Sequence, residues 1–432
     1  MHKTLNKALI ATLLLALTSP GQAEEWDDWD DDPWDEEASA LSIHGFVEAA
    51  AGYRLQSNPV IDEEWTLGEA RLQLEGIYQG SRAEWRFKLE GIGDGVAGEP
   101  VIDLREARVS FPLGERTDLR IGRQILTWGT GDLVFLNDLF PKDWVSFLIG
   151  RDDEYLKGTS DAIRVSWFGD RVNLDTVLTP RFNADTYITG ERLSYFDPAR
   201  NQIAAAPPRL WGRRPSTSIN NAELALRLYA MAGANEWAIY GYRGFFGQPT
   251  AFDPVRGDYT FARMNALGGS LRGPLAGGLY NLETVWYDSV DDRSGSDPFT
   301  PNSELRFLVG YEREMATNFT VGTQYVLEWL QDYDALRDAW PFDPAVRPDE
   351  RRHLITLRLS WRLKRDNLVI SAMNFYSPSA NDYFLRPTVQ YRFDDRLQLN
   401  AGIHLFGGKH EHSFYGQFEE NSSVWTRLRY SF

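Results

Sequence analysis

The chain has 432 residues, no cysteine and a formal net charge of −17. The lack of cysteine excludes disulfides, thiolate metal sites and cysteine nucleophiles, and the acidic balance argues against nucleic acid as a partner, because that binding needs a basic face. A mean hydropathy of −0.41 is too polar for a helical membrane protein. A transmembrane β-barrel can be this polar, because only alternate residues of its strands meet lipid.

The first 23 residues are predicted to be a secretory signal peptide. Lys3 and Lys7 supply a positive region, residues 8–17 form a short apolar core, and residues 21–23 read GQA, a small-residue cleavage site. The apolar core is shorter than the roughly 20 residues that a membrane-spanning helix needs. We therefore expect cleavage after Ala23, and no later stretch is apolar enough to predict a spanning helix.

Residues 24–40 are predicted to be an acidic periplasmic tail. Residues 24–37 read EEWDDWDDDPWDEE, a run whose self-repulsion favours disorder. The three tryptophans are unusual in a solvated tail. Two interpretations remain open: a flexible tail that keeps the barrel mouth open, or a peptide that binds a periplasmic partner or folds into the pore.

From Leu41 onward, apolar and polar residues alternate with the period of a β-strand. Trp85, Phe87 and Leu89, for example, alternate with polar neighbours. The pattern recurs in about 18 segments near the roughly 10 residues of a tilted transmembrane strand. Every second connection is very short, such as 394–395, and the connections between them are long and polar. Residues 41–432 are therefore predicted to form an all-β, transmembrane, antiparallel up-and-down β-barrel with both termini in the periplasm.

The residues opposite the apolar face are predicted to line a water-filled lumen. The last strands contribute mostly arginines to this face, which predicts a basic wall that attracts anions; the alternative is that lumenal charge pairs only hold the barrel shape. The predicted pore-lining residues are Arg86, Lys88, Arg108, Arg120, Gln124, Arg164, Arg227, Arg306, Arg358, Arg362, Arg392, Arg427, Arg429, Glu84, Glu106 and Glu312.

The loop 129–159 is too apolar for a segment that simply extends into water, with Leu133, Phe135 and Leu136 close together. We expect it to fold into the lumen and narrow it, with Asp132, Asp138 and Asp143 facing the wall arginines. The alternative is a lid over the outer mouth. A second long loop, 181–217, is another candidate for gating. The predicted constriction residues are Asp132, Asn137, Asp138, Lys142 and Asp143.

The end of the chain resembles the last strand of bacterial outer-membrane barrels. Residues 421–432 read NSSVWTRLRYSF, with apolar residues at alternate positions before a terminal Phe432. In that class of protein, the barrel-assembly machinery reads such a strand, so the resemblance implies this machinery as a partner.

Residues 122–129, GRQILTWG, followed by Asp132, Asp138 and residues 141–143, resemble a segment of the alginate-export barrels and related porin-like families. This resemblance implies 18 strands, a single-chain pore and an arginine-rich conduit for an acidic polysaccharide. Arg123 departs from the inward pattern, because Ile121 and Ile125 occupy its face. Only a β-bulge at this point would direct the Arg123 side chain towards the pore.

These patterns predict an outer-membrane channel, either a porin or a substrate-selective export or uptake pore. It would pass small polar or anionic solutes, or an acidic polymer, through a charged lumen in the bacterial outer membrane. The alternative is a barrel that anchors a periplasmic partner through residues 24–37. A hydrolase is less favoured, since the sequence has no G-x-S-x-G motif. We expect no catalysis, cofactor or metal site. The expected partners are outer-membrane lipid and a small-molecule or polysaccharide solute.

Overall fold

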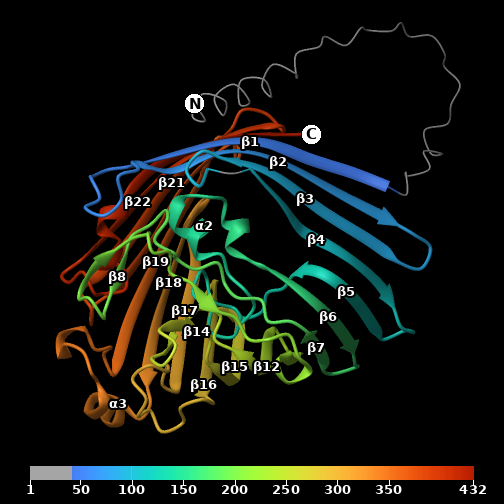
Figure 1. Cartoon of the computed structure of the whole chain (residues 1–432). Helices are drawn as coiled ribbons and strands as arrows, with labels where there is room; N and C mark the ends of the chain where they lie inside the picture. The colour runs from blue at the N-terminus through green and yellow to red at the C-terminus, as the bar shows by residue number, and fades with distance from the viewer. Residues whose placement is uncertain (1–40, 99) are drawn as a thin grey trace, which may run out of the picture.

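The computed structural model describes residues 41–98 and 100–432 (Figure 1). The predicted signal peptide and the acidic tail lie outside the described residues, so the structure tests neither.

Eighteen strands form one closed antiparallel β-barrel (Figure 1). Successive strands pair with one another, and the last strand pairs with the first, from Phe46 opposite Ser431 to Arg54 opposite Ser423. The predicted fold class and strand number are therefore confirmed. The barrel strands are β1 (Leu41–Arg54), β2 (Trp65–Gln79), β3 (Glu84–Asp94), β4 (Val101–Pro112), β5 (Thr117–Ile125), β6 (Thr159–Phe168), β7 (Asn173–Thr179), β11 (Glu223–Ala232), β12 (Asn235–Phe245), β15 (Arg263–Leu275), β16 (Gly278–Ser289), β17 (Glu304–Ala316), β18 (Phe319–Leu330), β19 (Arg351–Leu363), β20 (Leu368–Ser377), β21 (Asp382–Arg392), β22 (Leu397–Gly408) and β23 (Ser423–Ser431).

Alternation along each strand separates an apolar outer face from a polar inner face. On β3, Trp85 and Phe87 are about half exposed on the outside, whereas Glu90 is completely buried on the inside. Because the barrel is closed, every strand pairs on both edges. All strand N–H and C=O groups can therefore form hydrogen bonds, which lipid cannot supply. A closed barrel that is apolar outside and charged inside is the architecture of bacterial outer-membrane proteins.

The two ends of the barrel differ in their connections. Short turns close one end, while the other end carries long loops with small elements of their own. These elements are β8 (Tyr195–Asp197), β9 (Gln202–Ala204), β10 (Gly212–Arg213), β13 (Ala251–Asp253), β14 (Asp258–Thr260) and α3 (Tyr333–Ala339). Within the described residues, no helix is both long enough and apolar enough to cross a membrane.

The connection between β5 and β6, residues 126–158, enters the barrel; we call it the inner loop. It contains α2 (Trp144–Ile149) and the 3-10 turn η2 (Asp153–Leu156), and α2 lies within the ring of strands (Figure 1). Phe147 of α2 packs edge-on against Phe375 and Phe384, with ring centroids 6.0 and 5.7 Å away. Burial of these rings holds α2 against β20 and β21.

Candidate functional site in the lumen

Glu283 on β16 fixes the first half of the inner loop. Its side chain is buried, and its Oε1 accepts hydrogen bonds from Thr130 Oγ1 and the Gly131 amide, both at 2.8 Å. The Thr130 amide also donates to Oε1, and Asn137 Nδ2 donates to Oε2 at 2.8 Å. Charge-assisted bonds of this kind are stronger than neutral ones. One carboxylate thus fixes residues 130–137 against the wall.

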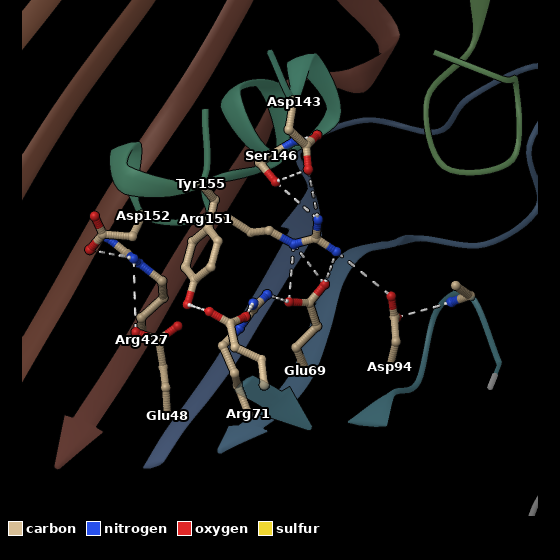
Figure 2. Close-up of polar contacts among 12 residues, drawn as sticks. Glu48, Glu69, Arg71, Asp94, Asp143, Ser146, Arg151, Asp152, Tyr155 and Arg427 are labelled. Atoms are coloured by element: carbon tan, nitrogen blue, oxygen red, sulfur yellow. Dashed lines mark hydrogen bonds and ion pairs between the residues drawn. The ribbon is translucent and has the colours of Figure 1, made fainter. Parts of the chain in front are cut away.

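Arg151 fixes the second half of the inner loop to the other side of the barrel (Figure 2). Its Nε donates to Glu69 Oε1 on β2 at 3.0 Å, and its Nη1 donates to Ser146 Oγ at 3.0 Å. Glu69 also pairs with Arg71 at 3.0 Å. Asp143 accepts the Ser146 amide at 2.8 Å and so caps α2. This network holds the helix in one position across the lumen.

Acidic residues of the inner loop meet the arginines of the last strands. Asp153 pairs with Arg386 on β21 at 2.7 Å, and Asp152 pairs with Arg427 on β23 at 2.9 Å. Burial acts to raise the pKa of Asp152, but Arg427 and Arg429 outweigh burial and lower it. The predicted basic wall is therefore largely neutralised where the loop touches it.

The second long loop, residues 180–222, also contacts the inner loop. Asp185 Oδ1 accepts the Lys142 amide at 2.9 Å, and its Oδ2 accepts Trp144 Nε1 at 2.8 Å. Burial raises the pKa of this Asp185 carboxyl. Further along, Arg192 donates to the Thr66 carbonyl at 2.8 Å and pairs with Asp94. The loop is thus fixed both to the inner loop and to β2 and β3, and its predicted role in gating stays a prediction.

Open space remains in the lumen beside the inner loop. A cavity of about 810 Å³ lies between the inner loop and the wall, and a second cavity of about 270 Å³ adjoins it. Both are lined by Arg272, Arg358 and Asp132. Arg358 Nη1 pairs with Asp132 Oδ2 at 2.9 Å, and both side chains are partly exposed. Among the described residues, Arg272 has no ion-pair partner, so its guanidinium is available to a solute.

The sixteen predicted pore-lining residues all lie on the inner face of their strands. Arg227 and Arg358 line the larger cavity, and Glu312 lines the smaller one. Gln124 is buried, and its amide donates to the Ala162 carbonyl at 3.0 Å. Within the described part of the chain, no ion pair involves Arg120, Arg362, Arg392 or Glu312. All the other charged members of the set form ion pairs with one another or with neighbours: Arg86, Lys88, Arg108, Arg164, Arg227, Arg306, Arg358, Arg427, Arg429, Glu84 and Glu106.

The predicted constriction residues divide into two groups. Asp132 faces the wall, as expected, whereas Asp138 and Asp143 do not. Asp138 pairs with Lys142 at 3.0 Å, with both side chains buried, and Asp143 caps α2. Asn137 binds Glu283. The expectation that all three aspartates face wall arginines was wrong, because buried donors of the loop itself must be satisfied first.

Arg123 does not turn into the lumen. It pairs with Asp161 through Nε to Oδ1 at 2.7 Å and Nη2 to Oδ2 at 2.9 Å. The register of β5 with β6 runs without a shift from Thr117 to Ile125, so Arg123 shares the outer face of Ile121. The resemblance to alginate-export barrels therefore does not extend to a pore role for Arg123.

The sequence prediction missed several residues of this site. Arg386 and Arg272 alternate in phase with inward residues of β21 and β15, so periodicity alone could have found them. Pro387, next to Arg386, and the glycines before Arg272 weaken the strand pattern there. Arg151 lies in a loop, and no periodic signal indicates its partner.

The fold and the charged lumen define a porin-like barrel of the bacterial outer membrane. Among solved structures, OccAB3 of Acinetobacter baumannii is similar, with 10% identity, a TM-score of 0.53, and coverage of 91% of this chain and 99% of that one. Pseudomonas aeruginosa OccD3 (OpdP) is also similar, with 11% identity, a TM-score of 0.51, and coverage of 91% and 90%. At such identities, the likeness concerns the fold. No protein-family model matches the sequence, and no curated protein does so either.

Proposed function

We propose that the protein is an outer-membrane channel that passes small polar or anionic solutes through the two cavities beside the inner loop. The observation that carries this proposal is the position of the Arg358–Asp132 pair and the unpaired Arg272, which line both cavities. A solute that moves from one cavity to the other must pass these side chains.

The charge arrangement favours anions over cations. Arg227, Arg272, Arg358 and Arg386 approach the larger cavity from the wall. Two of their acidic partners, Asp132 and Asp153, come from the inner loop. Arginine presents a planar fork that matches carboxylate and phosphate groups. Arg272 supplies such a fork without a competing carboxylate among the described residues, which supports transient binding of an anion.

The test is ion selectivity in a planar lipid bilayer. Replacing Arg272 and Arg358 by Gln should shift the reversal potential in a salt gradient towards cations, because two lumenal positive charges are lost. Neutralising Arg358, Arg362 and Arg392 together should shift the reversal potential in the same direction. Arg313→Gln is the matched control, since Arg313 lies on the outer face of β17. Unchanged reversal potentials in both sets would reject the proposal.

The finer alternatives stay predictions. An acidic polymer as the solute rests on the resemblance to alginate-export barrels. An anchor for a periplasmic partner rests on residues 24–37, which lie outside the described residues; a pull-down with and without them would test it. The absence of catalysis and the recognition of β23 by the assembly machinery also stay predictions.

A further inference from the structure

Two arginines point outward from neighbouring strands near the loop end of the barrel. Arg243 on β12 lies on the same face as Ile239, and Arg263 on β15 lies on the same face as Leu267. Arg263 is opposite Phe245, two residues from Arg243 along β12. Both arginine side chains are exposed. The two guanidinium groups therefore occupy one small area of the outer surface.

Their height on the barrel places them at the outer edge of the apolar band. Arg243 lies eight residues beyond Asn235, the first residue of β12. With a rise of about 3.3 Å per residue and a strand tilt of about 40°, Arg243 lies roughly 20 Å above the turn end of the barrel. The apolar band of such barrels is about 25 Å tall, so Arg243 lies near its upper edge. Asn265 lies opposite Arg243 on the outward face, and the outward positions below this pair include Ile239 and Leu267, which are about half exposed. Arg243 and Arg263 thus lie where lipid headgroups begin.

No carboxylate forms an ion pair with either arginine among the described residues. Arg263 Nη2 donates to Asn221 Oδ1 at 3.3 Å. Of the nearby acids, Asp288 pairs with Arg293 at 3.2 Å, and Asp291 accepts the main-chain amide of Arg263 at 2.7 Å and not its guanidinium. An outward arginine is costly in lipid and is tolerated near the interface. An external anion would complete the hydrogen bonding of both guanidinium groups.

The surroundings of the pair match an amphiphile rather than a free ion. Leu224 on β11 is directly opposite Arg243, and Ile239 and Leu267 continue the apolar surface towards the turn end. Ile219, before β11 and two residues from Asn221, is 83% exposed. An arginine pair above an apolar strip fits a molecule with an anionic headgroup and acyl chains.

We propose that Arg243 and Arg263 bind a phosphate of an outer-leaflet glycolipid, whose acyl chains lie along Leu224, Ile239 and Leu267. The anion is a phosphate, because phosphorylated headgroups supply the negative charge at this membrane level and arginine binds them by a fork. The site is independent of the solute that crosses the lumen.

The test uses the full barrel, purified in detergent, and lipid A as the ligand. Binding is measured by native mass spectrometry for bisphosphorylated lipid A, for its dephosphorylated form and for inorganic phosphate alone. We expect the bisphosphorylated form to bind about ten-fold more tightly than the dephosphorylated form, since charged hydrogen bonds are lost in the latter. Inorganic phosphate at the same concentration should not bind measurably.

The test variant carries both Arg243→Gln and Arg263→Gln. The control variant is Arg313→Gln, because Arg313 is an outward arginine at the turn end of β17. The double variant should lose the preference for phosphorylated lipid A, and the control should keep it. Unchanged conductance and heat-modifiable gel migration establish that the variants fold. Equal binding of both lipid forms, a preference that survives the double substitution, or equally tight binding of inorganic phosphate would overturn the proposal.

Discussion

Arg358 on β19 and Asp132 in the inner loop form an ion pair of 2.9 Å that lines both lumenal cavities. The pair joins the wall to a loop residue 226 positions earlier in the chain. Its two side chains are partly exposed, so the Coulomb attraction between them is screened by water. The pair therefore contributes more to the charge of the conducting path than to stability.

Asp132→Asn should raise anion selectivity, because Arg358 then faces the path without its counter-charge. Arg358→Gln should lower it, and the double variant should fall between the two single variants. Reversal potentials in a salt gradient measure the effect. The free energy of unfolding should change by less than about 1 kcal/mol in each variant. A shift of the reversal potential towards cation selectivity in Asp132→Asn would contradict the position of this ion pair in the conducting path.

Glu283→Ala should release the first half of the inner loop. The substitution leaves the amides of Thr130 and Gly131 and the side chain of Asn137 without their acceptor. We expect a loss of about 2 kcal/mol in the free energy of unfolding, together with larger current noise and higher single-channel conductance. Glu283→Gln keeps one acceptor and should show a smaller change. Glu312→Gln, an exposed lumenal carboxylate, is the control; an effect as large there would exclude a specific role for Glu283.

Arg151→Ala should destabilise the second half of the inner loop. Glu69 would lose a buried partner at 3.0 Å but would keep Arg71. The expected loss is about 2 kcal/mol in urea unfolding, below the full cost of an unpaired buried charge. Arg151→Lys keeps the charge without the fork and should be intermediate. If Arg151→Lys and Arg151→Ala lose the same free energy of unfolding, the stabilisation depends on the forked geometry of the guanidinium and not on its charge.

Asp185 should give the contact between the two long loops a pH dependence. Burial raises its pKa in the folded protein, so its contribution to stability is complete at low pH and is lost as pH rises through the folded pKa. The difference in Tm between Asp185→Asn and the wild type should therefore change as pH rises above the ordinary aspartate pKa of about 4, with the variant gaining relative to the wild type as pH rises. A difference in Tm that does not depend on pH would contradict the raised pKa of Asp185.

The barrel was predictable from the sequence because strand alternation and turn length are local properties. The outward position of Arg123 followed from its neighbours Ile121 and Ile125, and the structure agrees. The interior of the lumen was less predictable. Arg151 and Glu69 are 82 residues apart, and Asp138 binds Lys142 instead of the wall. Such contacts depend on how a folded loop satisfies its buried groups, which periodicity does not encode.

Solutes that cross the lumen are expected to pass Arg272 beside the inner loop. Because the chain has no cysteine, a single introduced cysteine can be modified selectively to test this. Arg272→Cys is modified with a bulky methanethiosulfonate reagent during single-channel recording, with Arg313→Cys on the outer face as the control. Modification at 272 should reduce the conductance, and modification at 313 should not. Complete modification at 272, established by mass spectrometry, with an unchanged conductance would contradict the account.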